Sequence, residues 1–574
     1  MQQLRSSRSL RPAAGLAGLS LALALVGCGG GASQGASTSN ASPAPTPAPK
    51  AAALPEPFWA SDAPIRPSVA PLFAAKTATA PAIALTAAEQ AALATPSPAA
   101  ARIAPAVQPL APQLRIVTGL RSFSYHQDTT TTLQAFDLSA ATIQAMVPNT
   151  AGGFDTLTGV GHNDGTFSIQ NVPEGYYWLR FGSTYVWTNT NFIDWSNDVF
   201  GRADANYPSI DPTSLNLALT NLNAWQPSDE LTWVVPNQGE ALSLPLTSTG
   251  ISNAPAPGDT TLPAFGMNFT NGDLFFPLLD ATRGDQAYLN QLTTRPAGSD
   301  SYRALAKSYL APATTMTDGV ATSLSGGFLD VPQTSTLRLN WKRSAFAAFA
   351  PAVNPSATPS GSYFFSYAYP LPSTYGLPYN AFQLLDYSGS GTADLDLGDL
   401  PYGNPFPAAW TVAAEAYQAF SVSYLAPGAA NPLTLTRYAY QATTTLPTAT
   451  APMAPLLGPV QNFKINGKDL FSNQLSVGTS PTLTWSAPAV GAASGYVVTC
   501  FRIFASGGNT AIQTVGRFRT KATSMTLPGV LAPGNTYIFT ISAIRANGVD
   551  MGQTPFRATL PYAFTTAMSA IVAP

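Results

Sequence analysis

The stretch 164–181, DGTFSIQNVPEGYYWLRF, predicts two short strands joined by a turn. Side chains alternate between the two faces of an extended backbone, and apolar residues recur at every second position of both segments. These alternating residues are Phe167 and Ile169, then Tyr177, Leu179 and Phe181. Between the two segments, Gly175 can adopt the positive φ that such a turn requires. We therefore expect a β-hairpin here.

The full pattern of this stretch, D-G-x-F-x-I-x-x-V-P-x-G-x-Y-x-L-x-F, resembles the carboxypeptidase-regulatory-like (transthyretin-like) β-sandwich modules of secreted bacterial proteins. The resemblance places such a module over 113–192, with Gly175 and Tyr177 in structural roles. In that family the module is usually a non-catalytic accessory, so its name implies no peptidase activity in this chain.

A second resemblance lies at the other end of the chain, over 456–574. Trp485 stands in the strand-like run TLTWSAP, and Leu531-x-Pro533-Gly534-x-x-Tyr537 precedes an apolar run. Both features resemble the fibronectin type III domain, whose core tryptophan and tyrosine corner they match. The resemblance implies structural roles for Trp485 and Tyr537. The tyrosine ring is expected to fill the core while its hydroxyl returns to the backbone.

The N-terminus reads as an export signal. Three arginines precede an apolar run over 13–26, which is too short for a comfortable transmembrane helix. The run ends in Leu25-Val26-Gly27-Cys28, which resembles the lipobox of bacterial lipoproteins. The resemblance implies a signal peptide over 1–27, cleavage before Cys28 and lipid attachment, palmitate included, on that cysteine. The alternative is an ordinary signal peptide with a chance cysteine. Gly29 in place of aspartate resembles the enterobacterial sorting pattern for the outer membrane.

Residues 28–112 read as a disordered, lipid-anchored tether rich in alanine, proline and serine. Proline recurs too often for a strand ladder, so extended and polyproline II conformations should dominate. One short helix is expected over 85–94 (LTAAEQAALA), and other parts of the tether can dock on the folded region. The sequence 31–35 fits G-x-S-x-G, but it lacks the strand and helix that a nucleophile elbow needs, so we interpret it as a chance match.

Composition excludes several classes of function. Hydrophobic residues make up 45% of the 574 residues, charged residues only 10%, and the net charge is −2. Nucleic-acid binding needs a basic face, so we expect no nucleic-acid partner. No cofactor motif is present, and we expect none. The chain has two cysteines, and with Cys28 lipidated no intramolecular disulfide can form, which leaves Cys500 as a half-buried free thiol on a strand.

The middle of the chain, 193–455, is punctuated by proline, glycine and threonine between short strand-like runs. This texture favours one or two further β-sandwich domains of unknown type. Only 300–310 and 410–420 have a faintly helical pattern. The expected fold class is thus mainly β, with several β-sandwich domains in series after the tether.

Aromatic residues are dense in 363–387, YFFSYAYPLPSTYGLPYNAFQLLDY. Alternation predicts that the aromatic residues at 363, 365, 367 and 369 share one strand face that packs on a core. Three prolines surround Tyr375 and Tyr379 and favour an exposed loop. Exposed aromatic side chains stack on sugars or contact partner proteins, so these two tyrosines are the candidate ligand-binding residues.

Two polar clusters invite a metal interpretation. Asp394, Asp396 and Asp399 follow a flexible Ser-Gly run and offer the oxygen ligands that calcium prefers, but EF-hand spacing is absent and a solvated acidic turn is the alternative. His126 and His162 each have an aspartate nearby, but no HExxH motif or Cys/His cluster exists. We interpret both histidines as solvated loop residues.

These features together favour a non-catalytic, lipid-anchored protein of the bacterial cell envelope, which faces either the periplasm or the exterior. Its β-sandwich modules would serve binding or adhesion, with a polysaccharide or an envelope protein as partner. The alternative is a hydrolase acting on an envelope or extracellular polymer, with its site in 193–455. Two carboxylates roughly 5 to 9 Å apart in a cleft would favour that alternative.

Overall fold

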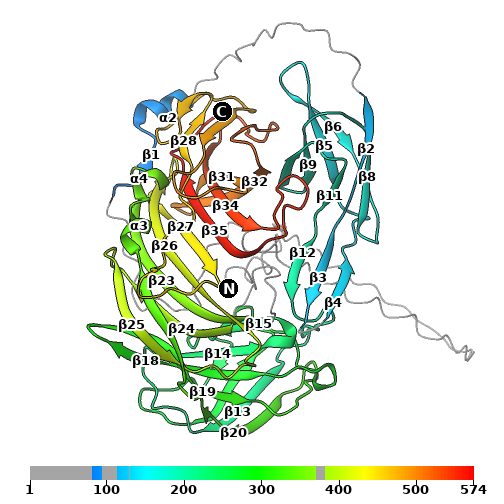
Figure 1. Ribbon diagram of the computed structural model, residues 1–574. Helices are drawn as coiled ribbons and strands as arrows, with labels where there is room; N and C mark the ends of the chain where they lie inside the picture. Colours follow the sequence, from blue (N-terminus) through cyan, green and yellow to red (C-terminus); the bar gives the residue numbers. More distant parts are fainter. Residues whose placement is uncertain (1–79, 94–112, 128–129, 370–381) are drawn as a thin grey trace, which may run out of the picture.

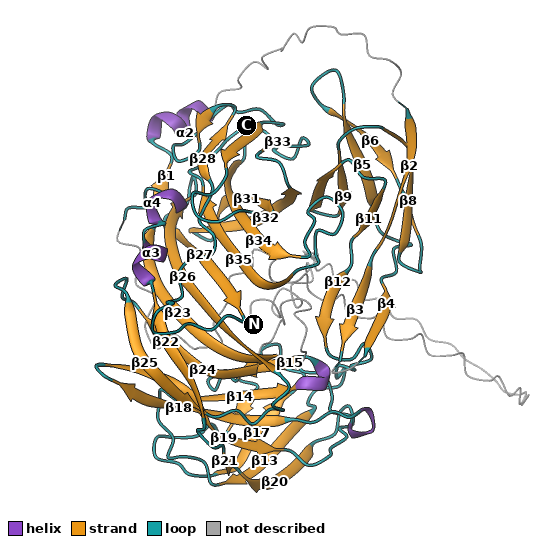
Figure 2. Cartoon of the chain, viewed as in Figure 1, coloured by secondary structure: helices purple, strands orange, loops and turns teal. Residues whose placement is uncertain are grey.

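The computed structural model describes residues 80–93, 113–127, 130–369 and 382–574. These residues are mainly β-sheet, arranged in several sheets as strands β1 to β35 with a few short helices (Figure 2). The expected fold class, mainly β with several sheets, is confirmed. In the described part of the chain no helix has the length and apolar character needed to cross a bilayer.

The first module has two facing sheets and a smaller three-stranded sheet made of β12 (Asn197–Phe200), β3 (Ser122–His126) and β4 (Thr131–Ala135) (Figure 1). β8 (Thr166–Pro173) pairs with β2 (Leu114–Leu120), whereas β9 (Tyr177–Phe181) pairs with β5 (Ile143–Pro148). The hairpin predicted over 164–181 is therefore wrong, although both strands exist. The turn, in which Gly175 has a φ of 117°, carries the chain from one sheet to the other. The two apolar faces meet across the core instead of lying side by side, and alternation alone does not distinguish these arrangements.

Strand pairing joins the modules into one large sheet. It runs from the first module through β10 (Thr184–Thr188) to β32 (Asn509–Thr520), and then through β31, β34 and β35 of the last module. From there it continues through β27, β26 (Thr411–Leu425), β23, β24, β19 (Asp300–Leu310), β18, β14 and β15 of the middle region. The remaining bounds are β31 (Gly495–Ser506), β34 (Thr536–Asn547), β35 (Thr559–Met568), β27 (Leu433–Thr443), β23 (Thr358–Tyr369), β24 (Phe382–Gly389), β18 (Tyr288–Ala297), β14 (Glu230–Val235) and β15 (Glu240–Ser243).

Both segments with a faintly helical pattern are strands. Residues 300–310 form β19 (Asp300–Leu310), and most of 410–420 belongs to β26 (Thr411–Leu425). β26 has β23 on one side and β27 on the other, and most of its side chains are buried. Alanine and glutamate favour a helix only weakly, and two hydrogen-bonded neighbours with burial on both faces outweigh that preference.

The last module has a four-stranded sheet packed against its part of the large sheet. Its strands are, in order, β29 (Lys468–Asp469), β28 (Gln461–Ile465), β30 and β33 (Ser524–Thr526). Trp485 on β30 (Thr482–Ser486) is buried in the core between them. The Tyr537 ring is buried too, and its hydroxyl accepts a hydrogen bond from the Ala532 backbone N–H at 2.8 Å. Cys500 on β31 is completely buried rather than half-buried, and burial raises the pKa of its thiol well above the usual value.

A short segment far upstream docks on this framework. β1 (Ile83–Ala84) pairs in parallel with the end of β26, and α2 (Ala87–Leu93) confirms the helix expected over 85–94. Thr86 and Glu89 exchange hydrogen bonds, and the Asn473 side chain donates to the Ala84 carbonyl and to Glu89. We call residues 83–93 the N-terminal clasp. This part of the predicted tether is an integral part of the fold.

Candidate functional site: a pocket between the first module and the middle region

The residues singled out in the sequence do not assemble into one site. Cys28, Tyr375 and Tyr379 lie outside the described residues. The expected structural residues are placed in the two end modules: Tyr177 is completely buried in the first core, and Trp485 and Tyr537 are buried in the last. None of them borders the pocket described below.

The three aspartates considered for calcium are instead paired with cations. Asp394 contacts Lys342 at 2.8 Å, and Arg338 contacts Asp396 at 2.7 Å and Asp399 at 3.6 Å. The Lys342 hydrogen bond is the main cause that lowers the pKa of Asp394 to about 2. In the described ranges no group of three histidine, cysteine or acidic side chains could hold a metal ion.

The two histidines differ from one another. His162 is exposed, as expected. His126 was expected in a solvated loop, but it ends β3 (Ser122–His126) and is only 6% exposed. Its Nε2 lies 3.0 Å from an Asp198 carboxylate oxygen, and its Nδ1 lies 3.0 Å from the Thr131 hydroxyl. The carboxylate comes from β12 (Asn197–Phe200), seventy-two residues away in sequence, so no local pattern reveals the contact.

A pocket of about 250 Å³ lies where the first module meets the middle region. We call it the junction pocket. Four distant stretches supply its lining, namely the end of β3, the 3-10 turn η1 (Pro236–Gln238), the start of β18 and the approach to β26. Its lining residues are His126, Gln127, Pro236, Asn237, Gly284, Gln286, Tyr288, Pro407 and Trp410.

Close backbone packing fixes the first module against η1. Gly239 ends this turn with a φ of 65°. A Cβ atom at Gly239 would lie 2.2 Å from the Phe200 carbonyl oxygen, so only glycine fits between the turn and β12. The Gly201 N–H also donates to the His126 carbonyl. The two sides of the junction pocket are thus held in register by the backbone itself.

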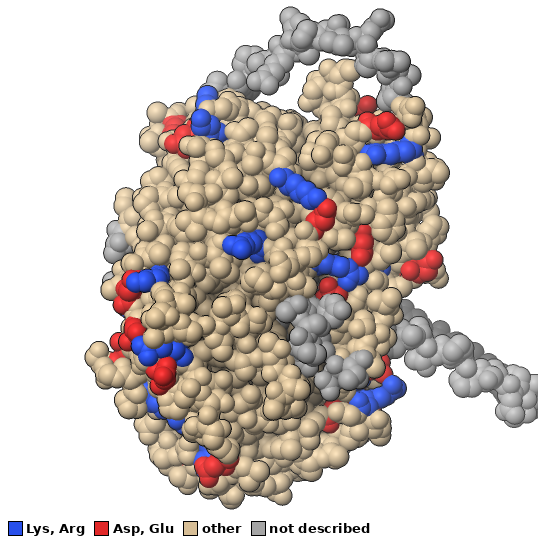
Figure 3. Space-filling view, in the orientation of Figure 1, with Lys and Arg blue, Asp and Glu red and all other residues tan. Residues whose placement is uncertain are grey.

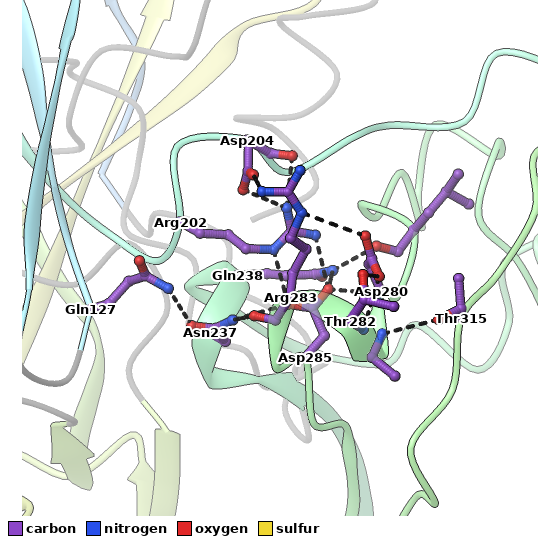
Figure 4. A network of polar contacts seen from close by, with 12 residues as sticks. Gln127, Arg202, Asp204, Asn237, Gln238, Asp280, Thr282, Arg283, Asp285 and Thr315 are labelled. Atoms are coloured by element: carbon purple, nitrogen blue, oxygen red, sulfur yellow. Dashed lines mark hydrogen bonds and ion pairs between the residues drawn. The ribbon is translucent and has the colours of Figure 1, made fainter.

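A buried ion pair lies behind the pocket wall (Figure 4). Arg202 donates to both carboxylate oxygens of Asp285, at 3.0 and 2.9 Å, and the Asp285 side chain has no exposed surface. Gln238 also donates to Asp285, at 2.6 Å. Such a bidentate, fully hydrogen-bonded pair holds its members in a single geometry. Asp285 is therefore a fixed acceptor next to the pocket.

Two amide side chains connect this ion pair to the pocket. Asn237 Nδ2 donates to the Arg283 carbonyl at 2.7 Å and to Asp285 at 3.3 Å. Gln127 Nε2 donates to Asn237 Oδ1 at 2.6 Å. In Figure 4 the side chains of Asp285, Asn237 and Gln127 follow one another in that order, and the last two line the pocket.

The opposite part of the lining is aromatic. Trp410 is half-buried and stacks on Phe406, with ring centres 5.3 Å apart and planes 13° apart. Tyr288 meets Phe406 edge-on at 5.4 Å, and its hydroxyl donates to Gln286 at 3.3 Å. Phe406 thus supports both aromatic residues that border the pocket.

The lining is electrically neutral apart from one imidazole. None of its nine residues is an aspartate, glutamate, lysine or arginine. The visible face of the molecule is mostly uncharged, with acidic and basic side chains scattered over it (Figure 3). Aromatic rings with a few placed amide groups are the usual lining of a site for an uncharged polar ligand.

A second group of ionisable residues is buried in the large sheet. Asp386 on β24 and Glu415 on β26 both lie opposite Phe365 on the strand between them. Two strand spacings put their backbones roughly 10 Å apart. Glu415 accepts a hydrogen bond from the Tyr369 hydroxyl at 3.0 Å, and burial raises its pKa to about 7.

Asp386 has a cationic partner. Arg303 contacts Asp386 at 3.0 Å and Glu230 at 2.6 Å, so one guanidinium serves two buried carboxylates. Burial raises the pKa of both acids, and Arg303 opposes that shift.

Sequence reasoning missed the junction pocket because its residues are spread over 126–410 and carry no shared motif. The one local signal was Trp410, a large aromatic residue that follows a proline-rich run. Its stretch, 410–420, has a faintly helical pattern and did not suggest a binding site. No protein-family model and no curated protein matches this chain.

Proposed function

We propose that this chain is a non-catalytic lipoprotein of the bacterial outer membrane that binds a polysaccharide or an envelope protein in the junction pocket. The observation that carries the proposal is the lining itself, whose described residues combine the rings of Tyr288 and Trp410 with three amide side chains and include no aspartate, glutamate, lysine or arginine. Such a lining contacts a neutral polar ligand through ring faces and hydrogen bonds rather than through charge. The aromatic contacts of this site are Trp410 and Tyr288, whereas the candidates Tyr375 and Tyr379 lie outside the described residues.

The end modules are proposed as accessories. The first has the residue pattern of a carboxypeptidase-regulatory-like module, and the last has the buried tryptophan and the tyrosine hydrogen bond of a fibronectin type III domain. In this proposal the first module also forms one wall of the pocket, through His126 and Gln127.

Binding is tested by pull-down on insoluble envelope polysaccharides (peptidoglycan sacculi, cellulose and chitin) and on immobilised detergent extracts of the envelope. We expect Trp410→Ala to reduce the bound fraction severalfold, because it removes an aromatic wall of the pocket. The matched control is Tyr176→Ala, which removes a 54% exposed aromatic side chain outside the pocket. Equal binding by wild type and Trp410→Ala would refute the site.

Membrane attachment is tested separately through Cys28. Cys28→Ala should abolish labelling by alkyne palmitate and release the protein from the membrane fraction, because the thiol carries the lipid. Cys500→Ala is the matched control and should leave the label unchanged, since that thiol is completely buried. Persistent labelling of Cys28→Ala would contradict the anchor.

Hydrolysis is the second candidate function, and the observation that favours it is the carboxyl group of Glu415 alone, because Asp386 on the other side of Phe365 is committed to the Arg303 ion pair. A carboxyl group with a pKa near 7 is suited to donate a proton at neutral pH. Release of reducing ends from an envelope polysaccharide by wild type, and its loss in Glu415→Gln, would support a hydrolase. Release that is equal in both proteins would exclude Glu415 from such chemistry.

A further inference from the structure

We propose that the junction pocket holds one ring of a neutral saccharide, with a sugar hydroxyl donating its proton to Gln127 Oε1. This inference rests on the proposed binding function and specifies its ligand class. It follows from the direction of the hydrogen bonds between Asp285 and the pocket, which commits one N–H of Gln127 to Asn237 and turns the Gln127 oxygen, an acceptor, away from Asn237.

The buried ion pair sets that direction. The Asp285 carboxylate and the Arg283 carbonyl can only accept hydrogen bonds, so the amide nitrogen of Asn237 must face them. Asn237 then turns its oxygen to Gln127, and Gln127 must contribute its own nitrogen at 2.6 Å. The Gln127 oxygen consequently points away from Asn237 (Figure 4). A flip of either amide would place two like groups against each other.

A ligand group that bonds the Gln127 oxygen must therefore be a donor. Gln286 supplies the complement, because its oxygen accepts from the Tyr288 hydroxyl and its exposed amino group is left to donate. An acceptor and a donor in one pocket match the hydroxyl group, which can donate and accept at the same time. A ligand with several hydroxyl groups satisfies both amides.

The rest of the lining suits the carbon face of a ring. Trp410, Tyr288 and two prolines, Pro236 and Pro407, present apolar surface. The described lining contains no lysine or arginine, and its one imidazole, that of His126, already faces the Asp198 carboxylate at 3.0 Å. Phosphate and carboxylate ligands are therefore disfavoured, because they would lose hydration without gaining a counter-charge. The volume of about 250 Å³ is below the roughly 300–1,000 Å³ of sites that enclose a drug-sized ligand. This size fits a single ring, as one unit of a polymer.

The experiment titrates the full mature chain with cellotriose, chitotriose and maltotriose by saturation-transfer NMR and calorimetry. We expect at least one trisaccharide to bind, and its per-O-methylated form to bind about tenfold more weakly, because a methyl ether cannot donate to Gln127. Gln127→Leu should weaken binding of the hydroxylated sugar by a similar factor. Trp410→Ala should weaken binding of both forms, and Trp410→Phe should restore part of it. Tyr176→Ala is the unaffected control, and thermal unfolding confirms that each variant is folded.

Asn237 is a positioning residue. Its test is the ratio of the affinities for hydroxylated and methylated sugar, and not a loss of affinity alone. In Asn237→Ala the Gln127 amide is free to turn and offer its nitrogen, so the preference for hydroxylated over methylated sugar should fall toward one. A purely structural role would lower both affinities together and leave the ratio unchanged, which would overturn the fixed direction of Gln127.

The remaining outcomes separate this inference from the proposed function. If no trisaccharide binds, but an envelope protein is captured in a Trp410-dependent manner, the saccharide inference is wrong. The junction pocket is then still the binding site. If trisaccharide binding is indifferent to both Trp410→Ala and Gln127→Leu, the inference and the proposed site both fail.

Discussion

At the scale of single residues, Glu415 makes stability depend on pH. Burial raises its pKa from 4.5 to about 7, so the folded chain binds this proton more tightly than the unfolded chain does. The contribution of Glu415 is fully present below pH 4.5 and is lost as pH rises through 7. We expect the free energy of unfolding to fall by up to about 1.4 kcal/mol per pH unit within that window. Urea midpoints at pH 5, 6, 7 and 8 measure the slope.

The matched variant is Glu415→Gln, which keeps the shape and cannot ionise. This substitution should reduce the pH dependence of stability without removing it. The pKa of Glu230 is also raised, so Glu230 makes stability fall with rising pH as Glu415 does. Glu89 provides the control of opposite sign: its pKa is lowered, chiefly by the Thr86 backbone hydrogen bond, and Glu89→Gln should leave the slope above pH 5 unchanged. A slope in Glu415→Gln equal to that of wild type would contradict the assignment.

At the scale of elements, the N-terminal clasp should open on its own. Only two residues of β1 pair with β26, and the helix that follows buries no side chain. Its start depends on the reciprocal bonds between Thr86 and Glu89, whose loss costs about 0.5–2 kcal/mol. We expect Thr86→Ala to accelerate hydrogen exchange in 83–93 and at Asn473 while the global melting temperature stays constant.

A matched substitution isolates the cap. Glu89→Gln retains a group that can accept from the Thr86 N–H, whereas Glu89→Ala does not. Exchange should therefore be close to wild type in the first variant and faster in the second. Equal protection in both would mean that pairing with β26, and not the cap, holds the clasp.

Elements were predictable where one local signal determined them. The positions of β8, β9, β30 and α2 follow from alternation, from a core tryptophan and from a helical run bounded by prolines. β19 and β26 were not predictable because their burial on both faces removes the alternation that marks a strand. The partner sheets of β8 and β9 were not predictable either, since a hairpin and a crossing between facing sheets have the same local sequence.

At the scale of the whole molecule, the first and last modules are joined by strand pairing, by ion pairs and by a shared core, in which Trp178 and Tyr185 pack on Phe518. β10 and β32 pair over three residues in parallel. Beside them Arg557 of the last module contacts Asp194 at 2.9 Å and Asp198 at 2.7 Å. These aspartates lie on β11 (Phe192–Asp194) and β12, which pair with β2 and β3 of the first module. We expect Arg557→Met to cost about 2 kcal/mol, the range for hydrogen bonds to charged groups, and to raise hydrogen exchange in β10 and β32.

The control is an ion pair whose acidic member, Asp550, lies between β34 and β35 as Arg557 does. Lys521 pairs with Asp550 inside the last module, and both side chains are more than a third exposed. Lys521→Met should therefore change stability little and leave exchange in β10 unaffected. If Arg557→Met changes stability and hydrogen exchange in β10 as little as Lys521→Met does, the contact through Arg557 does not contribute to joining the modules.

The candidate site was beyond prediction for a reason that belongs to this scale. His126, Asn237, Tyr288 and Trp410 meet only because the first module packs on the middle region, and each is unremarkable in its own stretch. The low charge of the sequence did anticipate the neutral character of the lining. It could not indicate which neutral side chains come together.

The pairing of β10 with β32 also dictates an order of assembly. A ribosome makes the first module early, whereas β32 is made only near the end of the chain. Until then β10 is an open strand edge, able to pair with any other extended segment it meets, including β10 of another copy. Trp178, Tyr185 and Phe518, which are buried together in the finished protein, are apart during that interval. The time between the synthesis of these two strands is therefore when the chain is most exposed to misassembly, and it lengthens with every delay in the middle region.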